Sequence, residues 1–267
     1  MQKNILYAFV LLFFIVSCND KDSPIDPVEQ TDKCRLIKMI QGTHNGAEAD
    51  TTFTFFYNTA GKVEKVTEYN PYYNTKDTFL LAYNDAGRLV SVNARYRANY
   101  FKYNSNGTLA EAIATGGLTD TTRFRYEYAG SILPQKSICY QHDLVNKTWD
   151  TTEYRYVWQN GNVVSREQFS KGVSVIITGY QYDTIPNVAP DLLLMGFHYT
   201  IPIGYYEEFL YFNKNVVRKE STRYAASQYT YQTDSGRIVK SIESYLRPPY
   251  NTDTTTGYTR NYFYECK

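Results

Sequence analysis

The chain has few of the residues on which most catalytic and metal sites depend. Only three of its 267 residues are histidine and only two are tryptophan. His44, His142 and His198 lie far apart, and no HExxH, CxxC, GxSxG or phosphate-binding motif occurs. Asp143 directly follows His142, but adjacent strand residues point to opposite faces, so we expect this pair in a loop. The sequence therefore predicts no enzyme, no cofactor and no metal site.

An excess of charge of one sign is also missing. Lysine and arginine total 28 and aspartate and glutamate 27, which gives a net charge of +1. Such a balance provides neither a basic footprint for nucleic acid nor a drive to press against anionic lipid. Long apolar helical periods are absent after residue 18, whereas 28 tyrosines and 14 phenylalanines favour strands. We expect an all-β protein with no nucleic-acid partner.

The one long apolar run lies at the extreme N-terminus. Lys3 precedes apolar residues 5–16, a run shorter than the about 20 residues that a membrane span needs. A basic start, a short apolar run and small residues before a cleavage point are typical of a secretory signal peptide. Residues 15–18 resemble a bacterial lipobox, which implies cleavage before Cys18 and lipid on Cys18. An ordinary signal peptide with a chance cysteine is the alternative.

Residues 1–17 are thus predicted to be a lipoprotein signal peptide, and residues 18–33 a lipidated cysteine with a flexible tether. The tether is acidic, contains prolines and lacks large apolar side chains, so it cannot offset its ordering entropy. Its acidic start resembles the surface-export signal of Bacteroidetes lipoproteins, although a solvated linker explains the same residues. We expect a protein bound to the bacterial outer membrane through its lipid, on the periplasmic or the cell-surface side.

Three further cysteines follow Cys18. Cys34 opens the first strand-like segment and Cys266 ends the last, and the exported compartment permits disulfides. We predict a Cys34–Cys266 bond that closes nearly the whole chain into one loop. Cys139 lies in an apolar-flanked strand and is expected to be a packed thiol; three buried thiols are the alternative.

A turn motif recurs along residues 34–267. Tyr-Asn-x-x-Gly followed by a strand occurs at residues 57–63, 83–89 and 103–109. Looser copies centre on Gly130, Gly161 and Gly236, and one copy has Asn215 in place of the glycine. An aromatic strand end, an Asn that starts a turn and a Gly at positive φ describe a type I turn with a glycine bulge. We therefore expect Gly61, Gly87 and Gly236 at positive φ, with Asn215 as a tolerated substitute.

These hairpins resemble the YD-repeat (Rhs-like) family, and more closely Bacteroidetes lipoproteins of unknown function built from such hairpins. The resemblance covers residues 34–267 and is most specific around Gly61 and Gly87. It implies a fold and no catalytic residue. We expect about sixteen antiparallel strands in meander order. Because wide sheets twist and roll, we predict a curled or barrel-like sheet, with a β-propeller as the alternative.

Residues 185–206 depart from the repeat, because Pro186, Pro190 and Pro202 interrupt any central strand. They form either a lid or core plug, or a ligand-contacting loop. Tyrosines gather nearby, and Tyr205 and Tyr206 are our candidate ligand contacts. Another group lies at Tyr69, Tyr72, Tyr73, Tyr96 and Tyr100. Cross-strand packing is the competing explanation for all of them.

We therefore expect a non-enzymatic cell-envelope module for binding or interaction, whose ligand the sequence does not identify; a glycan and a protein are the candidates. The alternatives are a glycan-binding lipoprotein of a nutrient-uptake system and a hydrolase with an unrecognised site.

Overall fold

The computed structural model describes residues 34–43, 50–95, 97–116, 121–143, 147–187, 212–246 and 254–266. The predicted signal peptide, Cys18 and the tether lie outside these ranges. Within them, no helix is long and apolar enough to cross a membrane.

Sixteen strands account for almost all of the described chain. They are β1 (Cys34–Thr43), β2 (Thr51–Tyr57), β3 (Val63–Asn70), β4 (Thr75–Tyr83), β5 (Leu89–Ala94), β6 (Arg97–Tyr103), β7 (Leu109–Gly116), β8 (Thr121–Glu127), β9 (Lys136–Asp143), β10 (Thr148–Gln159), β11 (Asn162–Ser170), β12 (Val173–Pro186), β13 (Asn215–Ser221), β14 (Ala226–Asp234), β15 (Arg237–Leu246) and β16 (Thr254–Cys266).

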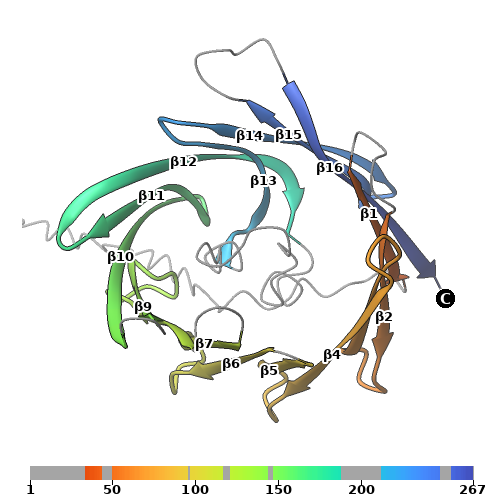
Figure 1. The fold of residues 1–267 in the computed structure, drawn as a ribbon, viewed down its shortest axis with the longest axis horizontal. Coiled ribbons are helices and arrows are strands. Elements are labelled where there is room, and N and C mark those ends of the chain that lie inside the picture. Colours follow the sequence, from red (N-terminus) through yellow and green to blue (C-terminus); the bar gives the residue numbers. More distant parts are fainter. Residues whose placement is uncertain are drawn as a thin grey trace, which may run out of the picture.

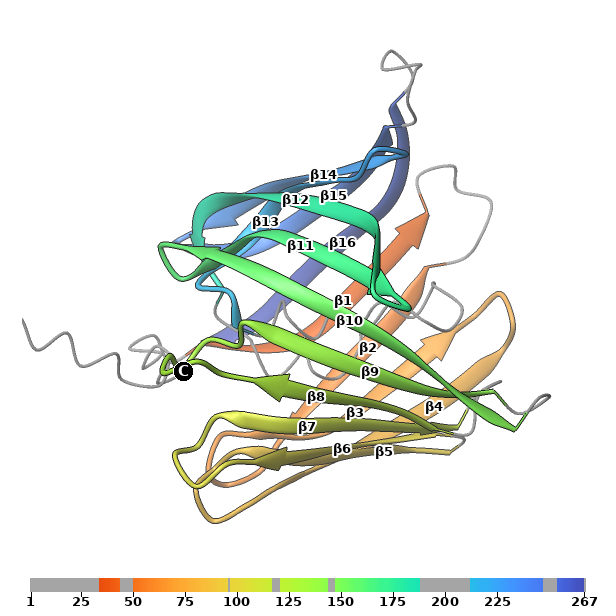
Figure 2. The same cartoon turned by 90° about the vertical axis from the view of Figure 1, so that its left-hand side faces the viewer.

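The strands form one closed antiparallel barrel. Each strand pairs with the next in sequence, and β1 pairs with β16 to close the sheet (Figures 1 and 2). The predicted all-β meander with a barrel-like sheet is confirmed. The propeller alternative is excluded, because a propeller consists of separate blades rather than one continuous sheet.

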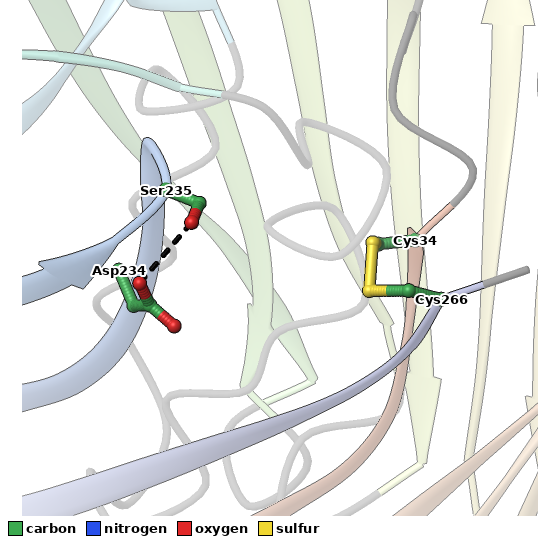
Figure 3. The surroundings of a disulfide bond; sticks show 4 residues. All are labelled: Cys34, Asp234, Ser235 and Cys266. Carbon is green, nitrogen blue, oxygen red and sulfur yellow. Dashed lines mark hydrogen bonds between the residues drawn. A yellow bond between two sulfur atoms is a disulfide. The ribbon is translucent and has the colours of Figure 1, made fainter.

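A disulfide joins the two ends of this sheet. Cys34 and Cys266 face each other at the start of β1 and the end of β16, and their sulfur atoms are bonded (Figure 3). The bond closes a loop between residues that are 232 positions apart. In the chain-entropy description, a loop of this length restricts the unfolded state by about 5 kcal/mol. The seam of the barrel is therefore locked covalently at one end.

The turn motif has the geometry that the sequence predicts. Gly61, Gly87 and Gly236 have φ values of 78°, 71° and 78°. In the β2–β3 turn, the Gly61 N–H donates to the Asn58 carbonyl at 3.0 Å. The register of β2 against β3 shifts just before this turn, as a bulge requires.

Two details of the turns differ from expectation. Asn215 begins β13 and is not among the described residues with positive φ; its side chain is needed for hydrogen bonds reported below. The hairpins at Gly161 and Gly236 have two-residue turns, because Asn160 and Ser235 also have positive φ, 52° and 49°. Positive φ at both central positions is the type I′ turn, whose twist matches that of the strands.

The barrel has two different ends. Because the strands alternate in direction, Cys34 lies at the same end as the turns that follow β2, β4 and β6. We call this the turn end. The β3–β4 turn, residues 71–74, lies at the opposite end, which we call the loop end.

An aromatic side chain near the end of every even-numbered strand donates a hydrogen bond to the strand before it. The donors are one tryptophan and seven tyrosines, and the acceptors are backbone carbonyls near the start of the odd-numbered strands. The pairs are Tyr57–Leu36, Tyr83–Val63, Tyr103–Leu89, Tyr128–Leu109, Trp158–Pro134, Tyr182–Val163, Tyr231–Val217 and Tyr264–Ile238, at 2.5–3.0 Å. We call this set the aromatic collar. It follows the turn end around the whole barrel.

The basic residue after the turn glycine has a matching role. Lys62 lies 5.6 Å from the ring of Tyr83, and the Arg88 guanidinium lies 5.8 Å from the ring of Tyr103. Each cation therefore covers the collar tyrosine of the next hairpin, within the range of cation–π attraction. The recurring tyrosine and the basic residue of the motif are thus explained by the architecture of the barrel.

The inner and outer faces alternate along each strand. Phe101, Ala112 and Phe124 pair across β6, β7 and β8 and are buried in the apolar core. That core also includes Phe53 and Val66, which are 1% and 0% exposed. Alternating burial of this kind places the core inside the barrel and leaves the intervening residues on its outer surface.

Candidate functional site

Several residues singled out from the sequence lie outside the described ranges. They are Cys18, His44, Tyr96, His198, Tyr205 and Tyr206. Of the segment that departs from the repeat, residues 185–187 alone are described. The proposed ligand contacts at Tyr205 and Tyr206 therefore stay predictions.

Four asparagines connect the chain on either side of this segment. The Asn187 N–H donates to the Lys214 carbonyl at 2.8 Å, and the Asn187 side chain donates to the Asn213 carbonyl at 3.1 Å. Asn213 Oδ1 accepts from the buried Val163 N–H at 2.8 Å. The Asn215 N–H donates to Asn162 Oδ1, also at 2.8 Å. The chain thus leaves the sheet and rejoins it at one place beside the β10–β11 turn.

His142 lies in β9, so the expected loop position is wrong. Its backbone pairs with that of Trp149 across β9 and β10, and the two ring centroids are 5.0 Å apart. An aromatic neighbour across the strands accounts for this histidine by packing.

The tyrosines that are close in sequence do not form one patch. Tyr72 and Tyr73 lie in the β3–β4 turn, 56% and 64% exposed, with ring centroids 4.8 Å apart. Tyr69 and Tyr100 are also exposed, but they lie on β3 and β6, with β4 and β5 between these strands. The largest set of tyrosines with a shared structural role is the aromatic collar.

A polar cluster lies on the inner face of β1, β14, β15 and β16. It consists of Gln41, Tyr229, Glu243, Tyr245 and Arg260, and we call it the Arg260–Glu243 cluster. Tyr229 pairs with Glu243 across β14 and β15, and Arg260 pairs with Gln41 across β16 and β1. The side chains of Arg260 and Glu243 are 12% and 7% exposed. A charged pair is therefore buried within the barrel wall.

Hydrogen bonds connect four members of the cluster in series. Arg260 Nε donates to Gln41 Oε1 at 2.8 Å, and Arg260 Nη2 lies 3.5 Å from Glu243 Oε2. The Tyr229 hydroxyl donates to Glu243 Oε1 at 3.4 Å. The Arg260 guanidinium lies 5.6 Å from the ring centroid of Tyr258, a further inner-wall tyrosine. The wall therefore combines a cation, an anion, an amide and aromatic rings.

Tyr245 is the accessible end of the cluster. Its side chain is 37% exposed, and burial, followed by the charge and the hydrogen bond of Glu243, raises the pKa of its hydroxyl. The Tyr245 ring lies against Gly257, where an added Cβ would overlap the ring atoms. The absence of a side chain at Gly257 therefore leaves room for the Tyr245 ring against the inner wall.

Sequence reasoning missed the Arg260–Glu243 cluster. Glu243 and Arg260 occupy strand positions that alternate with half-buried residues, and their inward neighbours include Ser241, Tyr245 and Tyr262. The signal was one charged residue within an alternating row that also contains tyrosines, but the sequence does not reveal which face of such a strand is inside.

Metal binding finds no support in the described ranges, where no group of three or more His, Cys, Asp or Glu side chains is placed to hold an ion. The Arg260–Glu243 cluster offers donors, acceptors and aromatic faces. These are the means of a binding site rather than those of a metal centre.

The outer face of the barrel carries charges and ion pairs. Lys102, Glu111 and Arg125 pair across β6, β7 and β8, on the side opposite the buried core. Glu111 accepts from Lys102 at 2.8 Å and from the Arg123 side chain at 3.1 Å. A second group joins Lys136 to Glu127 at 2.9 Å. The outer surface here is charged and hydrogen-bonded.

The fold is similar to that of a solved porin-like protein from Bacteroides uniformis. The TM-score is 0.58 at 12% identity, over 88% of this chain and 96% of that chain. A porin-like protein from Bacteroides vulgatus aligns with a TM-score of 0.44 at 14% identity, over 86% and 98% of the two chains. No family model matches the sequence, and neither does any protein of curated function. The first similarity supports the barrel fold, and the YD-repeat resemblance gains no family match.

Proposed function

We propose that this protein is a lipid-anchored barrel that stands in water at the outer membrane and binds a ligand without catalysis. The observation that carries the proposal is the charged outer face. Lys65, Lys102, Arg125 and Arg155 lie at outward strand positions, and Arg125 and Arg155 are 58% and 60% exposed. A lipid-facing barrel instead presents an apolar band, and each Lys or Arg at its midplane costs about 2–4 kcal/mol. A barrel surrounded by water has no such cost.

The inner face supports the same proposal. Phe53, Phe55 and Phe79 are 1–4% exposed and face inwards. A membrane pore places apolar residues outside and polar residues inside. From β2 to β8 this barrel has an apolar core inside and ion pairs outside, the arrangement of a water-soluble protein.

The position of the chain start favours attachment at the turn end. The proposed tether joins the barrel at Cys34, which lies at this end beside the disulfide. The loop end, with exposed Tyr72 and Tyr73, then points away from the lipid. We place the ligand-binding surface at the loop end and on the inner wall that leads from it.

Lipid attachment is tested at Cys18. Wild-type protein should incorporate radiolabelled palmitate and sediment with membranes, whereas Cys18→Ser should incorporate none. Cys139→Ser is the matched control and should label like the wild type, because Cys139 is a buried thiol within β9. Equal labelling of wild type and Cys18→Ser would rule out the proposed anchor.

A further inference from the structure

We propose that the Arg260–Glu243 cluster binds a neutral saccharide. The inference deepens the proposed function, on which it rests, by naming the ligand class and its place on the inner wall.

The first argument is the geometry of the buried charges. Glu243 accepts from Tyr229 at 3.4 Å and from Arg260 at 3.5 Å, and both distances are at the limit of a hydrogen bond. Replacement of a buried ion pair by apolar residues of similar volume is often neutral or stabilising, so folding alone gives little reason to bury a pair with such long contacts. Sites that conflict with folding rules in this way are characteristic of functional residues.

The second argument is the chemistry that the cluster offers. Adjacent hydroxyls of a sugar both donate and accept, so one hydroxyl can donate to Glu243 while its neighbour accepts from Arg260. Gln41 adds an amide beside the guanidinium, at 2.8 Å from Arg260 Nε. The charges of Arg260 and Glu243 cancel, so a neutral ligand suits this wall better than an anion or a cation.

The third argument is the aromatic platform. Tyr245 is 37% exposed, shares the inner face of β15 with Glu243 two positions before it, and its ring lies against Gly257. A flat ring held next to polar groups can stack on the apolar face of a pyranose while its hydroxyl points to the polar groups. Aromatic and polar side chains that converge in this way define small-molecule sites in general.

The test is calorimetric titration of the full-length lipidated protein in lauryldimethylamine oxide, a detergent that contains no sugar. The probes are maltotetraose, cellotetraose, xylotetraose and mannotetraose, with digalacturonate as an anionic comparison. At least one neutral probe should bind, and more tightly than digalacturonate. Tyr245→Ala should weaken that binding about tenfold, the effect of losing one aromatic contact. Glu243→Gln should weaken it as well.

Tyr100→Ala is the matched control, because Tyr100 is 43% exposed but lies on the outer face of β6. It should bind as the wild type does. The inference is overturned if no neutral probe binds, or if Tyr245→Ala and Tyr100→Ala bind equally well. Tyr245→Phe keeps the ring and should retain most of the affinity, so it serves if the alanine variant unfolds. None of these results bears on lipid labelling at Cys18, so failure of this inference and failure of the proposed anchor are distinguishable.

Discussion

At the scale of single residues, the recurring Tyr-Asn-x-x-Gly motif determines where the chain turns. Gly87 has a φ of 71°, and an added Cβ there would meet nothing nearer than the Lys62 side chain at 3.6 Å. Space is therefore available, and the cost of a substitution is conformational. Asn74 and Asn160 show that asparagine adopts positive φ in this chain, at 48° and 52°. These two residues, and not Asn215, show that asparagine can occupy a turn position at positive φ in this protein.

We predict that Gly87→Asn leaves the unfolding temperature nearly unchanged, whereas Gly87→Val lowers the stability by about 1–3 kcal/mol because a β-branched residue is strained at positive φ. Thermal unfolding followed by circular dichroism measures both variants. Equal unfolding temperatures would contradict the bulge geometry.

A second prediction concerns Glu111 and pH. Burial raises the pKa of this carboxyl, but the hydrogen bond from Lys102 and the charges of Arg123, Lys102 and Arg125 outweigh it, so the pKa lies below its ordinary value of 4.5. The stabilisation is therefore present above pH 4.5 and is lost as the pH falls through the lower folded-state pKa. Wild-type protein should lose more stability between pH 6 and pH 3 than Glu111→Gln. Parallel pH profiles of the two unfolding temperatures would show that the ion pairs contribute nothing.

At the scale of elements, the aromatic collar joins neighbouring hairpins. The Tyr83 hydroxyl reaches back from the end of β4 to the Val63 carbonyl in β3, at 2.9 Å. An aromatic side chain makes the same contact at the end of every even-numbered strand, so the collar strengthens the sheet along the turn end of the barrel. Burial raises the pKa of Tyr264 from its ordinary value of 10.0 to about 12, so this collar hydroxyl stays protonated and donating into more alkaline solution than a solvent-exposed tyrosine does.

Tyr83→Phe should remove one such hydrogen bond and leave the Val63 carbonyl without its donor. The expected loss is about 1 kcal/mol, or about 2–4 °C in the unfolding temperature of a protein of this size. Tyr100→Phe is the control, because Tyr100 is exposed on the outer face and is no part of the collar. If both variants melt at the wild-type temperature, the collar has no structural role.

Sequence patterns predicted these elements well because the signals are local. Tyr-Asn-x-x-Gly specifies a turn within a few residues, and the turns delimit the strands. Closure of the sheet was open between a curled and a barrel form, because it depends on the pairing of β1 with β16 across the whole chain. Inward placement of Arg260 and Glu243 was not predicted either. Alternation reveals two faces, but a polar residue among tyrosines does not identify which of them is inside.

At the scale of the whole molecule, the disulfide closes the sheet at one end, and the charged residues on the outer face support the proposal that the barrel lies in water. The Cys34–Cys266 bond fixes the point where the proposed tether meets the barrel. The porin-like protein of similar fold shares the arrangement of strands. Membrane insertion depends on which side chains face outwards, and here they include Lys102, Glu111 and Arg125.

Release from the membrane by cutting the tether tests the central claim most directly. A specific protease site would be inserted within residues 19–33, and isolated outer membranes would be treated with that protease in the absence of detergent. Only the lipid should hold the protein, so the barrel should appear in the supernatant as a folded, oxidised protein. A barrel that stays in the membrane pellet after complete cleavage would contradict the account, because it would then be held by its own strands.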